Sequence, residues 1–74
     1  MKYEYPCRID GEEGDYVASF RDVPGALTGG ATRAEALELA SDALRVALTY
    51  HFKKGELPPP SKPQPGEIMV SAIL

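Results

Sequence analysis

The sequence predicts an α+β domain in which one long helix packs on an antiparallel-rich sheet, with the elements in the order β-β-β-α-β. Three observations predict this fold class. Apolar and polar residues alternate near the start of the chain, as in half-buried strands. A long stretch without glycine or proline follows, as in a helix, and an almost wholly apolar stretch comes last.

The first strand is expected over residues 2–10. Alternate residues from Tyr3 to Ile9 are apolar, whereas most of the residues between them are charged, so one face of this strand should be buried. Pro6 lies among the residues of the other face. Because a proline has no N–H for a sheet ladder, we expect Pro6 near an edge or a bulge of the sheet.

Two further strands should follow after short turns. Residues 11–14 read GEEG, which is long enough for a hairpin loop, and the next strand alternates from Tyr16 to Phe20. Residues 22–25 read DVPG, a turn in which proline presets φ and glycine is free to take a positive φ. Residues 26–29 can then form a short third strand.

A helix is predicted from about Ala34 to about Lys54. Thr32 and Glu35 have the spacing of a capping box, and Gly55 follows two lysines as a C-terminal cap. The apolar arc is roughly 200° wide on a 3.6-residue helix, more than a sheet covers, so one flank is left for a second chain. The row expected to approach the sheet closely consists of alanines with leucines beside it: Ala36, Ala40, Ala43 and Ala47, flanked by Leu37, Leu44 and Leu48.

A proline-rich connector separates the helix from the last strand. Five of the seven prolines lie between Leu57 and Pro65, which predicts a stiff, extended segment. Residues 67–74 read EIMVSAIL and are apolar at nearly every position. This pattern is typical of a strand that is covered on both sides, or of an edge strand that awaits a partner.

Length and charge limit the possible functions. Seventy-four residues allow one small domain, and eight lysines and arginines against eleven acidic residues give a net charge of −3. This balance argues against generic binding to nucleic acid or to an anionic membrane, and it favours a basic partner. The apolar stretches are too short to span a bilayer and the start lacks a signal peptide, so a cytoplasmic protein is expected.

No catalytic residue, metal site or cofactor is predicted. The chain has one cysteine and one histidine, which excludes an internal disulfide and a Cys/His metal cluster. Cys7 is expected to be a small buried hydrophobe and His51 a structural residue on the apolar helix face. The acidic residues near the first turn are local to that turn, which favours a solvated loop or a contact with a basic partner over a metal site. These residues predict an interaction module and not an enzyme.

Two motifs carry a resemblance to a known family. Residues 14–25 read GDYVASFRDVPG and residues 26–36 read ALTGGATRAEA, followed by the long helix and the exit LPPPS at residues 57–61. Together they resemble the HicB antitoxin family, in which a G-Y-x-A-S-F-x-D-x-P-G strand and turn precede T-x-G-x-T-x-x-E-A and a helix. The resemblance covers essentially the whole chain.

The resemblance implies a compact domain likened to a cut-down ribonuclease H fold. It further implies binding to HicA, a small basic ribonuclease toxin, and coverage of the surface with which HicA cleaves RNA. Typical HicB proteins continue into a C-terminal DNA-binding domain. We expect residues 1–74 to form a single HicB-like domain without that second domain, so operator binding is not expected from this chain.

Two sets of candidate interface residues follow. The candidate toxin-binding residues lie at the acidic hairpin tip and in the motif-matched turn: Glu12, Glu13, Asp15, Asp22, Pro24 and Gly25. A homodimer or larger assembly is a separate expectation, since the last strand and the wide helix face offer excess apolar surface. The candidate residues for that contact are Tyr50, Ile68, Val70 and Ile73.

Two alternative functions remain open. The first is a stand-alone, oligomeric regulatory module without a toxin. The second is an RNA-binding or ribonuclease H-like domain, in which Tyr3, Tyr5 and Tyr16 would stack on bases, or Asp10 and Asp15 would support metal-dependent cleavage.

Overall fold

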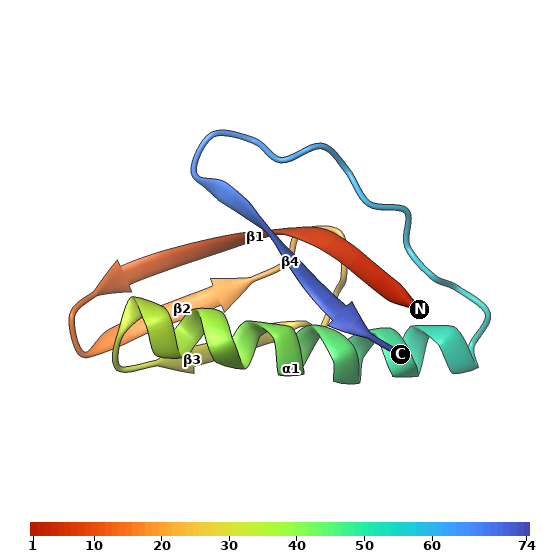
Figure 1. The fold of residues 1–74 in the computed structure, drawn as a ribbon, viewed down its shortest axis with the longest axis horizontal. Helices are drawn as coiled ribbons and strands as arrows, with labels where there is room; N and C mark the ends of the chain where they lie inside the picture. The colour runs from red at the N-terminus through yellow and green to blue at the C-terminus, as the bar shows by residue number, and fades with distance from the viewer.

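The computed structural model describes residues 1–74 as a four-stranded antiparallel sheet with one helix on a single face, which confirms the predicted fold class (Figure 1). The strand order is β3-β2-β1-β4, so the last strand lies beside the first. The elements are β1 (Lys2–Glu12), β2 (Asp15–Ser19), β3 (Leu27–Gly30), α1 (Arg33–Lys53) and β4 (Glu67–Ile73).

Strand β1 joins the two halves of the sheet. Residues up to Arg8 pair with β4, and residues from Arg8 onward pair with β2. Met1 and Leu74 form a hydrogen-bonded pair, with backbone N···O distances of 2.8 and 3.0 Å. In an antiparallel ladder such pairs recur at every second residue. Pro6, which lies opposite Met69, therefore falls at a pair without hydrogen bonds between β1 and β4. Pro6 therefore turns its missing N–H away from β4, where β2 has already ended. Strand β1 is an inner strand of the sheet and Pro6 is buried, so the proline is tolerated by this local gap in the ladder and not by a position on an edge strand.

The core lies between α1 and the face of the sheet that it covers. The buried face predicted for β1 is confirmed, because Tyr5, Cys7 and Ile9 are buried and Tyr3 is partly buried. Pro6 of the other face is buried as well, which the alternation did not predict. Val70 and Ala72 of the neighbouring strand β4 lie opposite Tyr5 and Tyr3 on the same face and extend the core. The remaining core residues come from β2, the loop after it and the helix: Ala18, Phe20, Val23, Ala26, Ala36, Ala40, Leu44 and Leu48.

The predicted alanine row is correct only for the first half of α1. Ala36 and Ala40 are fully buried, but Ala43 and Ala47 are only partly buried, and the leucines assigned to a flank, Leu44 and Leu48, are fully buried instead. The buried line thus follows every fourth residue, and larger side chains fill it toward the end of the helix.

The backbone of β3 comes very close to the first turn of α1 at Gly30. A Cβ atom at Gly30 would lie 2.6 Å from the backbone nitrogen of Ala36, which is closer than real Cβ contacts come. Strand β3 and the first turn of α1 therefore touch backbone to backbone, and only glycine fits at position 30.

The capping box of α1 is present with one change of partner. The Thr32 hydroxyl accepts a hydrogen bond from the Glu35 amide at 3.0 Å, as expected. The Glu35 carboxylate reaches back to the amide of Ala31, at 2.9 Å, instead of that of Thr32. Both bonds satisfy amides at a helix start that have no partner within the helix. The helix itself is not apolar enough to cross a membrane.

We expect Leu44→Ala to lower the free energy of unfolding by about 2–5 kcal/mol, because it removes a fully buried side chain. The matched control is Val46→Ala on the same helix, where the side chain is 62% exposed, and its effect should stay within about 0.5 kcal/mol. Urea denaturation measures both variants. Equal losses for the two variants would contradict the assigned burial of the helix.

Candidate partner-binding site

The acidic tip, defined as Glu12, Glu13 and Asp15, lies at the turn between β1 and β2, at one end of the elongated domain (Figure 1). All three side chains are exposed, and Glu12 stands opposite Asp15 in the ladder. The Gly14 amide donates to the Ala31 carbonyl at 2.7 Å, which fastens the tip against the segment before α1. The structure therefore gathers these three predicted residues into one firmly held, negatively charged surface.

The predicted turn residues do not join the acidic tip. The turn follows the far end of β2 from the tip, so the length of that strand separates the two groups. Pro24 and Gly25 are exposed, and Gly25 adopts the positive φ of 93° that the turn requires. The Nε2 atom of His51 lies 3.2 Å from the Pro24 carbonyl oxygen, a hydrogen-bond distance that ties the turn to α1. This contact confirms the structural role predicted for His51.

Asp22 holds the connector instead of facing a partner. Its carboxylate accepts hydrogen bonds from the Ser61 amide at 2.7 Å and from the Ser61 hydroxyl at 2.9 Å. Only 12% of its side chain is exposed. A carboxylate bound in this way has little capacity left for a toxin, so its first function is to fix residues 57–65 against the turn.

Arg21 is the residue that sequence reasoning did not single out. Its guanidinium binds both carboxylate oxygens of Glu67, at 2.8 and 3.0 Å, and also donates to the Lys62 carbonyl at 2.8 Å. Glu67 accepts a further hydrogen bond from the Gln64 amide at 2.8 Å, and 4% of its side chain is exposed. The residues that meet here are up to 46 positions apart, so no local pattern marks them.

The proline-rich connector is therefore held at three places along its length. The hydroxyl of buried Tyr5 donates to the Pro58 carbonyl, Asp22 holds Ser61, and Arg21 holds Lys62. Burial is the main cause that raises the pKa of the Tyr5 hydroxyl. The expectation of an extended segment is confirmed, and these bonds show how its path is set.

The tyrosines and the cysteine of the strands serve the core. Tyr5 is buried, and Tyr3 and Tyr16 pack partly buried against the same cluster, so their ring faces do not form a platform for bases. Cys7 is fully buried, and burial raises the pKa of its thiol, which disfavours the nucleophilic thiolate. These placements agree with the structural roles expected for these residues.

The residues proposed for self-association divide into two groups. Tyr50 and Ile73 are 57% and 71% exposed, whereas Ile68 is partly buried. The prediction that Val70 contacts a second copy is wrong, because Val70 is 7% exposed and belongs to the core. Side chains alternate along β4, so the residues that face α1 are unavailable to a partner even though the strand as a whole is apolar. Of the two patterns proposed for β4, the structure shows the edge strand.

Comparison with known proteins identifies one family. Residues 2–73 match the family model described as HicB_like antitoxin of bacterial toxin-antitoxin system. Antitoxin HicB 2 of Photorhabdus laumondii is 45% identical over 58 residues, which cover 77% of this chain and 42% of that protein. Antitoxin HicB of Escherichia coli K12 is 51% identical over 60 residues, which cover 80% of this chain and 44% of that protein. This chain thus spans less than half the length of these relatives.

A solved structure has the same fold over almost the whole chain. A chain from the structure described as HicA3 and HicB3 toxin-antitoxin complex superposes with a TM-score of 0.68 and 25% sequence identity. The match covers 96% of this chain and 96% of that one.

We expect the Arg21–Glu67 contact to make stability depend on pH. The hydrogen bond from Arg21 is the main cause that lowers the pKa of Glu67 from its ordinary value of 4.5. A carboxyl group with a lowered folded pKa stabilises the fold above pH 4.5, and this contribution is lost as the pH falls through the folded pKa. The free energy of unfolding should therefore fall below pH 4.5 more steeply in the wild type than in Glu67→Gln.

The measurement is urea denaturation over a series of pH values. Glu12→Gln in the exposed acidic tip is the control, because its carboxylate makes no hydrogen bond, and its profile should match the wild type. Parallel profiles for the wild type and Glu67→Gln would show that the contact does not contribute.

Proposed function

We propose that this chain, which belongs to the HicB-like family of bacterial antitoxins, neutralises a HicA-like toxin by binding it directly. The partner would be a small basic ribonuclease in the cytoplasm, and the bound domain would cover the surface that cleaves RNA. This is a function of binding and not of catalysis. In this proposal residues 1–74 act as one toxin-binding domain, and contact with an operator is not part of their role.

The acidic tip is the observation that carries the proposal. Its three carboxylates are exposed, lie at one end of the domain, and are joined there by exposed Asp10 two pairs earlier along β1. In a chain with a net charge of −3, this end concentrates the negative field. Such a field accelerates encounter with a positively charged protein and orients the two surfaces before they touch.

Apolar contact beside the tip would then prolong the complex. Val17 stands opposite Asp10 in the ladder and is 42% exposed on the face of the sheet that α1 does not cover. Charged groups at a rim mainly set the association rate, whereas desolvated apolar contacts at a centre set the dissociation rate. The tip and the adjoining open sheet face together provide both kinds of contact.

The comparisons support this function over the two alternatives. Relatives that share about half of their matched residues with this chain are named as HicB antitoxins, and the structural neighbour comes from a complex of a toxin with its antitoxin. Direct RNA binding through the strand tyrosines is disfavoured, because these rings pack on the face that α1 covers.

We expect a double reversal of charge, Glu12→Lys with Glu13→Lys, to slow association with the toxin by about tenfold or more at low salt. The loss should shrink as salt screens the charges. The probe is the product of the adjacent reading frame where it is a small basic protein, and stopped-flow association rates are measured at several ionic strengths. RNA cleavage by the toxin in the presence of each variant gives the functional readout.

The control is Glu4→Lys with Glu56→Lys, which changes the net charge equally at exposed positions away from the tip. Equal slowing by the two double variants would show that net charge matters and that the tip is not the contact. Separate elution of the wild-type chain and the basic protein in size-exclusion chromatography, with RNA cleavage unchanged, would overturn the function itself.

A further inference from the structure

The hydrogen bonds that hold the proline-rich connector recur at every third residue. The anchored residues are Pro58, Ser61 and Gln64, whose backbone groups bind side chains of the sheet and of the turn after β2. A polyproline II helix has about three residues per turn, so residues three apart lie along one ridge. Five prolines in this segment favour that conformation, because each one fixes φ at a value the helix requires. The domain therefore holds the connector along a single ridge.

The other two ridges of the connector face solvent. Pro60 and Pro63 form one ridge, Pro59 and Lys62 belong to the other, and all four residues are exposed. Arg21 binds the carbonyl of Lys62, and the ammonium group of that lysine forms no ion pair within the chain. The exposed surface thus has the P-x-x-P spacing and carries one free positive charge.

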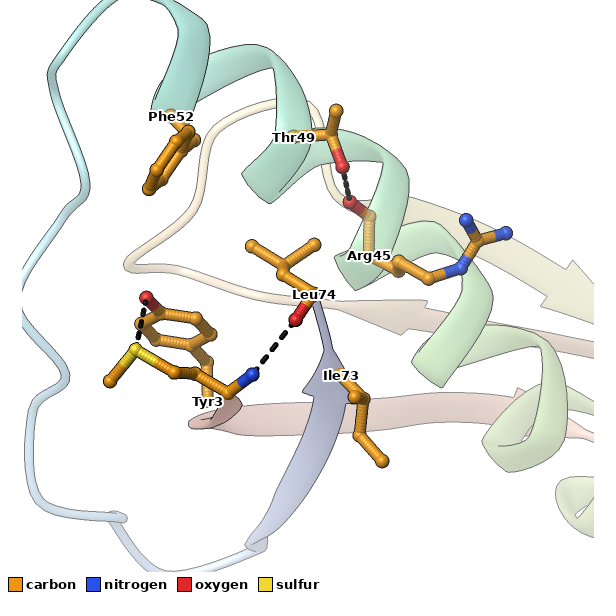
Figure 2. A pocket seen from close by; sticks show the side chains of 7 residues that line it. Tyr3, Arg45, Thr49, Phe52, Ile73 and Leu74 are labelled. Atoms are coloured by element: carbon orange, nitrogen blue, oxygen red, sulfur yellow. Dashed lines mark hydrogen bonds between the residues drawn. The ribbon is translucent and has the colours of Figure 1, made fainter.

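Packing within the domain does not account for these exposed prolines. They are absent from the core, and they do not line the apolar groove of about 520 Å³ between the second half of α1 and the paired ends of β1 and β4. Figure 2 shows Phe52 above Tyr3 and Leu74 in that groove, with the connector passing to one side of these residues. A stiff ridge that the fold holds but does not cover is available to another molecule.

An ordered proline ridge of this kind fits a groove lined by aromatic side chains. Such grooves bind P-x-x-P segments, and they gain affinity because the ligand already has the bound conformation and loses little entropy on binding. Charge narrows the choice of partner. Residues 57–66 carry a single charged side chain, that of Lys62, so carboxylates at the rim of the groove complement them. A basic toxin is unsuited to this ridge for the same reason.

We propose that residues 58–65 form a docking ridge for a protein other than the toxin, one that recognises polyproline II through an aromatic groove with an acidic rim. Residues 59–60 and 62–63 enter the groove, while the anchored ridge stays on the domain. The connector leaves from the end of α1, whereas the acidic tip is fastened beside the start of that helix (Figure 1). The two surfaces are therefore separate.

The probe is a panel of isolated SH3, WW and EVH1 domains that have a tryptophan in the groove and acidic residues at its rim. This chain contains no tryptophan, so a change in tryptophan fluorescence on titration with the intact domain reports on the groove alone. We expect saturable binding to members of the panel at micromolar concentrations of the domain.

Pro63→Ala should weaken this binding by about tenfold or more, because it removes a proline from the centre of the contact. The matched control is Pro24→Ala, which removes an exposed proline from the turn after β2 and should bind like the wild type. Circular dichroism checks that both variants are folded.

Lys62→Glu provides a second test that leaves every proline in place. It should weaken binding at low salt, and the loss should shrink as salt screens the charges. Arg33→Glu is the control, because it changes the net charge equally at an exposed position at the opposite end of α1.

The proposal is overturned if no domain of the panel responds, if Pro63→Ala binds as tightly as the wild type, or if Lys62→Glu and Arg33→Glu weaken binding equally. Because no toxin is present in these measurements, their failure leaves the proposed toxin binding untouched. Co-elution of Pro63→Ala with the basic partner would confirm that the docking ridge and the toxin contact are separate.

Discussion

The two-pronged contact between Arg21 and Glu67 determines where the last strand begins, and the rest of the structure depends on that position. The guanidinium engages both carboxylate oxygens and also a carbonyl of the connector, while Asp22 beside it holds Ser61. An extended proline-rich segment has few internal hydrogen bonds of its own. These side chains therefore supply the contacts that bring β4 back to β1.

Once β4 is placed, its two faces and its two edges acquire different environments. The residues that face α1 complete the core, as Val70 and Ala72 do. One edge pairs with β1 and the other stays open beside the groove. Because backbone groups and side chains both alternate along a strand, a single strand closes the core and keeps an outer edge that pairs with no other strand of the sheet.

The domain separates two kinds of surface along its length, which reaches 37 Å. The β1–β2 end is acidic and hydrated, which suits rapid encounter with a basic protein. The groove beside the β4 edge is lined mostly by apolar side chains and lies between the second half of α1 and the paired ends of β1 and β4.

The sequence by itself determined the features that depend on neighbours in the chain. Alternation identified the buried face of β1, the spacing of Thr32 and Glu35 located the helix start, and the acidic residues marked the tip. These signals are local, because a strand repeats every two residues and a cap acts within one turn.

Only the tertiary structure decided the roles of Asp22, Val70 and the leucines of α1. Asp22 belongs to a motif that the sequence offered for partner binding, yet its carboxylate is bound by Ser61, 39 positions away. Val70 is apolar like its neighbours, and the pairing of β4 with β1 decides that it points inward. Leu44 and Leu48 are buried because they continue the line of Ala36 and Ala40 along the side of α1 that faces the sheet. Each of these outcomes depends on the three-dimensional path of the chain, and no local repeat encodes that path.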